Sequence, residues 1–193
     1  FQGYLAGKCN TTGRYQIAIG PRAGCCFKTG DSNIVMGNTA GQQLCSGSGN
    51  IFIGSQAGRC NTTGGCNTIV GLVAGKALSS GSHNNVFGHF AGCRLAGGTH
   101  NLLMGNCAGY CLTGHNNVML GKSTGFNRSG NKYCRNVIIG DSAGNKAGTL
   151  AQGNFDVLIG FNAGCNYTGS CSIGIVHSVC LPIDDGMNQL AIC

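Results

Sequence analysis

Short apolar segments recur along the chain at a fixed interval, and glycine bounds each of them. The repeated unit reads G-x-x-N-h-h-h-G-x-x-A-G, where h is apolar, as in residues 47–58, GSGNIFIGSQAG. The glycine that ends the apolar triplet recurs every 17 residues from Gly3 to Gly105 and continues less regularly to Gly174. Three apolar residues are too few for the periodic face of a helix. The pattern therefore predicts short strands separated by tight turns.

Repetition at this period predicts stacked structural units, each of which buries its neighbours. A 17-residue unit has room for one coil of a parallel β-solenoid, with about 4.8 Å between successive coils. We therefore predict an all-β fold in which residues 1–174 form about ten 17-residue coils. Residues 175–193 break the repeat, and two short apolar segments flank Asp184-Asp185-Gly186. This tail is predicted to be a β-hairpin that caps the last coil or links to another subunit.

Two further positions in the unit are almost invariant among the copies. Alanine precedes the second glycine in nine of ten copies, and Thr124 is the exception. A small residue there suits a narrow interior corner. A side-chain amide precedes most of the apolar triplets, and stacked amides can form a hydrogen-bonded ladder along the solenoid. The residues of this column are Gln16, Asn33, Asn50, Asn67, Asn84, Asn101, Asn117, Asn136 and Asp156.

The apolar triplets place two apolar columns on neighbouring strand positions. Neighbouring residues of a strand point to opposite faces, so one column fills the coil and the other forms an outward stripe. An exposed stripe of this length predicts coverage by identical chains. The alternative is a second internal layer within a wider coil. The residues predicted to form the oligomer face are the middle ones: Ala18, Val35, Phe52, Ile69, Val86, Leu103, Met119, Ile138 and Leu158.

Composition narrows the function classes. The 193 residues include 36 Gly but only 9% charged residues, and the net charge is +7. The basic residues are scattered singly, unlike the dense stripes that bind nucleic acid. Weak binding of these basic residues to anionic glycans or a cell surface is an alternative. No apolar run approaches the length of about 18 residues that predicts a membrane span, so membrane insertion is not expected.

Fourteen cysteines, an even number spread along the chain, predict a secreted, oxidised protein. Cys60 with Cys66 and Cys165 with Cys171 share one spacing and are predicted loop disulfides. Cys9 and Cys26 lie one repeat apart, within the Cα separation of a disulfide, and Cys180 with Cys193 would close the tail. Four sequons begin at Asn10, Asn61, Asn127 and Asn166 and are candidate glycosylation sites. An asparagine-rich chain also produces such triplets without any modification.

Two insertions interrupt the repeat after residue 130 and after residue 144. Insertions in solenoids form protruding loops, which often bind partners. The candidate contact residues are Lys132, Tyr133, Arg135 and Lys146. The chain also starts within a repeat, which predicts head-to-tail contact between subunits and growth into a filament. His83 and His100, one repeat apart, are expected to stack at about 5 Å without forming a metal site.

The segments Asn50–Gly58 and Asn136–Gly144 resemble repeats of phage and viral tail fibres and bacterial surface adhesins. They are also similar to the Asn-Ser-Val-Ala-Ile-Gly repeats of trimeric autotransporter adhesin heads. This resemblance covers about residues 1–174 and implies a left-handed β-roll, trimerisation through the strand face and a role in attachment. Two features differ from those adhesin heads: the 17-residue period, against about 14 residues there, and the many cysteines.

The five aspartates and the absence of glutamate argue against an enzyme, because no paired carboxylates, nucleophile motif or cofactor-binding motif is present. We therefore expect a non-enzymatic, extracellular structural protein that assembles with itself and uses no cofactor. The alternative is a receptor- or glycan-binding fibre or adhesin whose specificity lies in the inserted loops. Ice binding ranks below both, because the Ser/Thr column is irregular.

Overall fold

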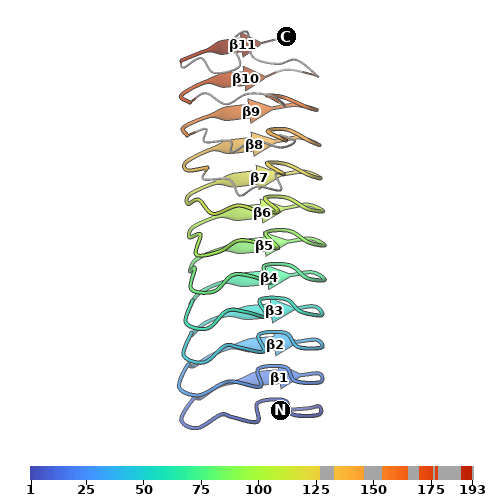
Figure 1. The fold of residues 1–193 in the computed structure, drawn as a ribbon, viewed down its shortest axis with the longest axis vertical. Coiled ribbons are helices and arrows are strands. Elements are labelled where there is room, and N and C mark those ends of the chain that lie inside the picture. The colour runs from blue at the N-terminus through green and yellow to red at the C-terminus, as the bar shows by residue number, and fades with distance from the viewer. Residues whose placement is uncertain (127–132, 146–153, 165–169, 176, 178–187, 193) are drawn as a thin grey trace.

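The chain forms one parallel β-solenoid with coils of about 17 residues, as predicted (Figure 1). The computed structural model describes residues 1–126, 133–145, 154–164, 170–175, 177 and 188–192. No helix found in these ranges is long and apolar enough to cross a membrane. The described strands are β1 (Ile17–Ile19), β2 (Ile34–Met36), β3 (Ile51–Ile53), β4 (Thr68–Val70), β5 (Asn85–Phe87), β6 (Leu102–Met104), β7 (Val118–Leu120), β8 (Val137–Ile139), β9 (Val157–Ile159), β10 (Ile173–Ile175) and β11 (Leu190–Ile192).

The strands stack in sequence order and in strict register. Ile34 pairs with Ile51 and Val35 pairs with Phe52, so each residue lies beside its equivalent in the next repeat. The same rule holds across the insertion between β8 and β9, where Val137 pairs with Val157. The extra residues of that insertion therefore leave the strand stack unchanged.

Most of the predicted C-terminal hairpin, including its Asp-Asp-Gly turn, lies outside the described residues, so the hairpin stays a prediction. β11 pairs with β10 in parallel, which makes it a further strand of the same stack. A two-residue turn can join only antiparallel strands, whereas parallel neighbours need a longer connection. The 14 residues between Ile175 and Leu190 provide that length.

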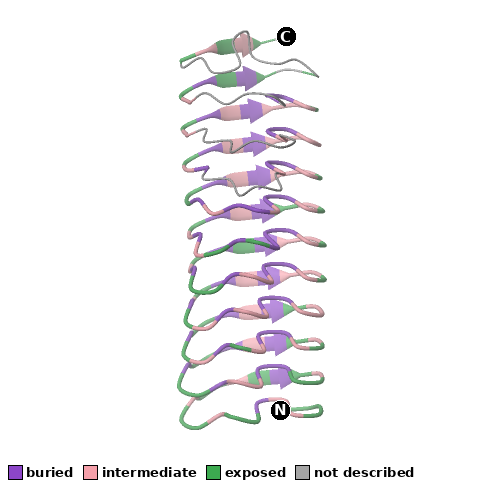
Figure 2. Cartoon of the chain, in the orientation of Figure 1, coloured by how far each residue is buried: buried purple, intermediate pink, exposed green. Residues whose placement is uncertain are grey.

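The middle residue of each strand points into the coil, as the buried middle segments of the strands in Figure 2 show. Phe52 and Leu103 are completely buried, and the whole column belongs to one apolar core. The prediction that these residues form the oligomer face is therefore wrong, because this column forms part of the core. The buried residues are Ala18, Val35, Phe52, Ile69, Val86, Leu103, Met119, Ile138 and Leu158.

Two other columns complete the core. The alanines before the second glycine are buried, including Ala57 and Ala74, as the sequence predicts. The third column lies three residues after that glycine and was not identified from the sequence. Its apolar members are Phe27, Leu44, Leu78, Leu95 and Leu112, all buried.

The glycine after each strand is required by the close approach of the next coil. Gly54 has φ +129°, and a Cβ there would lie 2.4 Å from the carbonyl oxygen of Gly71. No side chain fits at that distance, and the backbone conformation also disfavours L-residues. The 17-residue glycine series therefore marks one line along which successive coils approach too closely for a side chain.

The amide column forms a buried asparagine ladder, as predicted, which runs from Asn33 to Asn136 and continues at Asp156. Asn84 Nδ2 donates to Asn67 Oδ1 at 3.0 Å and to the carbonyl oxygen of Gly98 at 2.8 Å. Asn84 Oδ1 accepts hydrogen bonds from the backbone N and from Nδ2 of Asn101. Each asparagine therefore connects the coil before it to the coil after it.

Replacing a ladder asparagine should destabilise the whole solenoid. Asn84→Ala leaves buried partners unsatisfied on both sides, so we expect a loss of about 2–4 kcal/mol in the free energy of unfolding. The neighbouring Asn85 is exposed, and Asn85→Ala should change stability by less than about 0.5 kcal/mol. Chemical denaturation of both variants measures the difference. Equal effects would contradict the structural role of the ladder.

Candidate functional site

The exposed face of the strand stack is the most extensive uniform surface that the structure describes. We call the first and third residues of the eleven strands the strand face. Of these outward positions, only Thr68 and Asn85 are polar, and none is charged. Ile53 remains 37% exposed and Met104 47% exposed. The face therefore presents two parallel columns of aliphatic and aromatic side chains to solvent.

Alternation along the strand explains this arrangement. Because the middle residue of each strand is buried, both of its neighbours must point outward. The stripe expected from the sequence therefore exists, but it consists of Ile19, Met36, Ile53 and their equivalents. It does not consist of the column that was predicted. A second internal layer does not form on this side, since these residues contact solvent.

The structure separates the four candidate contact residues. Tyr133 is buried in the core, and its hydroxyl donates to the carbonyl oxygen of Gly144 at 3.2 Å, so it is not a surface residue. Burial raises the pKa of Tyr133, with a smaller contribution from Asp156. Arg135 is exposed, and its guanidinium carbon lies 5.3 Å from the centre of the Phe155 ring. Lys132 and Lys146 lie outside the described residues.

Tyr133 is buried because it stands at a position where the preceding coils have glycine. Its carbonyl oxygen accepts from Asn117 Nδ2 at 2.7 Å, as the carbonyl of Gly114 does from Asn101. Because this position faces the interior of the coil, the ring of Tyr133 occupies space in the core. The insertion therefore adds a core residue where a contact residue was expected.

The predicted disulfides of the described coils are not formed. Cys9, Cys26, Cys60, Cys66 and Cys171 are free thiols. The backbone N of Cys60 bonds to Lys76 of the following coil, whereas that of Cys66 bonds to Ser48 of the preceding coil. Stacking thus fixes these two cysteines in different columns. Cys165, Cys180 and Cys193 lie outside the described residues.

Cys9 and Cys26 occupy neighbouring coils of one column, as expected, but they remain unbonded. Burial raises the pKa of Cys26, and Cys25, Cys45 and Cys9 raise it further. A raised pKa keeps the thiol protonated and therefore slow to react.

The sequon at Asn61 cannot carry a glycan in this fold, because Asn61 is completely buried. It stands in the third core column between Leu44 and Leu78, and neither atom of its side-chain amide has a hydrogen-bond partner among the described residues. Asn10 is half-buried, and its Nδ2 donates to the carbonyl oxygen of Gly13 at 3.0 Å. Asn127 and Asn166 lie outside the described residues. A three-residue motif cannot reveal which way its asparagine points.

Asp156 replaces asparagine in the ladder and is buried. Its backbone N donates to Asn136 Oδ1 at 2.8 Å, and its Oδ1 accepts from the backbone N of Ser172 at 3.0 Å. Burial raises the pKa of Asp156 to about 6, although the hydrogen bond from Ser172 lowers it. The buried position therefore favours the neutral carboxyl more than water does, at the place where other coils have a neutral amide.

The histidine pair stacks as expected. The rings of His83 and His100 are 4.8 Å apart and nearly parallel, with an angle of 5° between them. They border a hollow of about 350 Å³ beside Asn85 and Leu102 of the strand face. Within the described ranges, no group of three or more His, Cys, Asp or Glu side chains could hold a metal ion.

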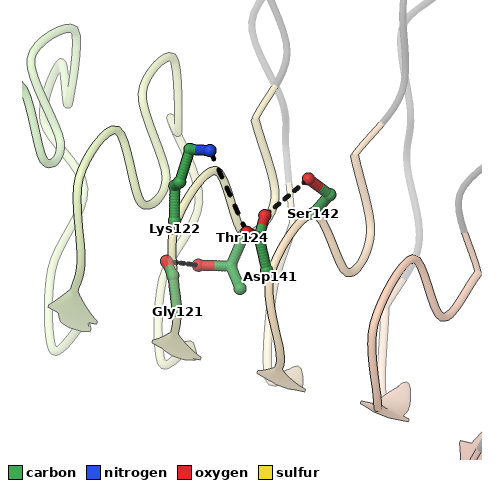
Figure 3. Close-up of polar contacts among 5 residues, drawn as sticks. All are labelled: Gly121, Lys122, Thr124, Asp141 and Ser142. Carbon is green, nitrogen blue, oxygen red and sulfur yellow. Dashed lines mark hydrogen bonds and ion pairs between the residues drawn. The ribbon is translucent and has the colours of Figure 1, made fainter. Parts of the chain in front are cut away.

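Polar side chains also meet in the turns that follow β7 and β8 (Figure 3). Lys122 Nζ lies 4.0 Å from Asp141 Oδ2 in the next coil, and Ser142 Oγ donates to Asp141 Oδ1 at 2.7 Å. Thr124, which replaces the usual alanine, donates from its hydroxyl to the carbonyl oxygen of Gly121 at 3.0 Å. This hydrogen bond explains how a buried position tolerates a polar residue.

Comparison of the chain with protein-family models, curated proteins and solved structures finds no match in any of the three.

The buried amide of Asn61 predicts a stabilising substitution. Asn61→Leu removes a polar group without partners and extends the leucine column, so we expect a gain of about 1–3 kcal/mol in the free energy of unfolding. Chemical denaturation measures this change in the free energy of unfolding. Asn61→Ala is the control, because it removes the amide without filling the space. A leucine variant less stable than the wild type would contradict the burial of Asn61.

The raised pKa of Asp156 predicts stability that falls as pH rises. An unfolded aspartate has a pKa of about 3.9, whereas the folded value is about 6. The folded chain therefore binds more protons between these values, and the contribution of Asp156 to stability is fully present below about pH 4. We expect a loss on the order of 2 kcal/mol between about pH 4 and pH 7.

Asp156→Asn isolates this contribution, because the amide does not titrate. Denaturation at several pH values should show that the variant gains stability relative to the wild type as pH rises through 6. A difference between the two proteins that does not change with pH would contradict the assignment.

Proposed function

We propose that this chain is a non-enzymatic structural protein of an extracellular fibre, in which identical copies associate side by side through the strand face. The observation that carries the proposal is the uncharged, apolar strand face along eleven stacked strands. Soluble monomers rarely expose contiguous apolar patches of more than a few hundred Å². At about 4.8 Å per strand, this face extends for roughly 50 Å.

A second copy of the chain is the partner that fits this face best. Burial of apolar area stabilises association by about 25 cal/mol per Å² before the costs of binding. The columns keep their apolar character from coil to coil, so a second copy presents a face of matching chemistry along its whole length. The resemblance to trimeric adhesin heads and tail fibres supports a trimer, while the end-to-end contact expected from the sequence stays a prediction.

The described acidic residues support the non-enzymatic part of the proposal. Asp31 accepts a hydrogen bond from the backbone N of Arg14, Asp141 faces Lys122, and Asp156 belongs to the ladder. Each of the three therefore has a structural partner. Glycosidase chemistry would instead need two opposed carboxylates across a cleft.

A charge placed on the strand face should prevent association. We expect Ile53→Lys combined with Met104→Lys to lower the association constant at least about a hundredfold, because two unpaired charges would be buried in each contact. Analytical ultracentrifugation over a concentration series measures the oligomeric state.

The control is Thr29→Lys combined with Thr63→Lys, which adds the same charge at exposed positions away from the strands. It should assemble as the wild type does, and circular dichroism should show that all variants keep their β structure. A wild-type chain that stays monomeric at about 100 μM, far above a micromolar Kd, would overturn the proposal.

A further inference from the structure

A second hollow lies away from the strand face, on the turns that follow β5, β6 and β7. It has a volume of about 350 Å³ and is lined by Arg94, Cys107, Tyr110 and Phe126. These residues lie three to seven positions beyond the ends of their strands, at the side where each coil turns back (Figure 1). We call this feature the corner hollow.

Aromatic rings form one side of the corner hollow. The ring centres of Tyr110 and Phe126 are 5.2 Å apart, and those of Phe90 and Tyr110 are 6.2 Å apart. All three residues are half-buried, so their rings are fixed by packing and still reach solvent. Burial raises the pKa of Tyr110. Its phenol therefore keeps its proton and remains a hydrogen-bond donor at neutral pH.

Arg94 supplies the positive charge of the corner hollow. Its side chain is exposed, and it forms no ion pair with any residue in the described part of the chain. The neighbouring Lys122 differs, since Asp141 lies opposite it (Figure 3). Burial raises the pKa of the Cys93 thiol beneath this corner, and the charges of Lys76 and Arg94 counteract that rise. The corner is therefore positively charged, and Arg94 is its available cation.

We propose that the corner hollow binds a carboxylated saccharide, such as a uronic acid residue of an acidic glycan. The C–H face of a pyranose ring would lie against Tyr110 and Phe126, whose rings give it a broad apolar contact. The sugar carboxylate would accept two parallel hydrogen bonds from the Arg94 guanidinium. Ring hydroxyls would pair with the Tyr110 phenol.

The size and chemistry of the hollow favour this ligand over other anions. Binding pockets of about 300–1,000 Å³ usually combine apolar walls with a few polar groups. An inorganic anion would use Arg94 but not the aromatic wall, and a neutral sugar would use the wall but not Arg94. A carboxylated sugar is the class that needs both.

This site is separate from the proposed self-association, because none of its lining residues belongs to the strand face. Failure of one proposal therefore leaves the other intact. It also lies outside the two insertions, where the sequence pattern placed the contact residues.

The test is titration calorimetry of the full chain with three probes: a galacturonic acid trisaccharide, the neutral galactose trisaccharide and inorganic sulfate. We expect the acidic trisaccharide to bind at least about tenfold more tightly than either of the others, which corresponds to about 1.4 kcal/mol. Arg94→Gln and Tyr110→Ala should each weaken its binding at least about tenfold.

Arg135→Gln is the matched control, because it removes an exposed arginine that also lies near an aromatic ring. It should change the affinity by less than about twofold, and Tyr110→Phe should keep most of the ring contact if Tyr110→Ala proves unstable. The proposal is overturned by absence of binding at about 10 mM trisaccharide, a range where even Kd values of 1 mM are seen. It is also overturned if the neutral sugar or sulfate binds equally well, or if Arg135→Gln is as damaging as Arg94→Gln.

Discussion

Each coil of this chain has only three strand residues and no helix in the described ranges, so its backbone groups find hydrogen-bond partners in the neighbouring coils. The N–H of Ile51 bonds to Asn67 in the coil after it, and the N–H of Gly54 bonds to Met36 in the coil before it. Buried backbone groups without partners would be costly. A coil is therefore stable only when equivalent residues of its neighbours lie directly beside it.

Exact stacking explains which residues the repeat must keep. Gly54 and its equivalents admit the next backbone at 2.3–2.8 Å from where a Cβ would stand. The asparagine ladder joins successive coils through buried side chains, as Asn50 does with Asn33 and Gly64. Tyr133 stands in place of a glycine whose carbonyl oxygen accepts from the ladder, and its own carbonyl oxygen keeps that contact with Asn117. The pairing of β7 with β8 is therefore retained.

The sequence predicted the repeat, the parallel solenoid and the ladder, because each depends on spacing alone. It did not predict which strand column faces inward, since alternation separates two faces without identifying either. The ladder itself held the missing information. Asn50 is buried, and Phe52 lies two residues further along the same strand, so both must point inward. Asn61 escaped prediction for a related reason: its sequon suggested exposure, but the third core column runs through it.

The same constraint assigns different roles to the two surfaces. On the strand face, stacking repeats one side-chain chemistry in every coil, and a uniform surface suits a uniform partner such as a second copy. At the turns the backbone also repeats, but Lys76, Cys93, Tyr110 and Phe126 follow one another in the same position of successive coils. Among the described coils, the rings of Tyr110 and Phe126 therefore meet the Arg94 cation at one height of the solenoid. Regular stacking thus favours self-association along the length of the molecule and restricts ligand recognition to the coils where the turn residues change.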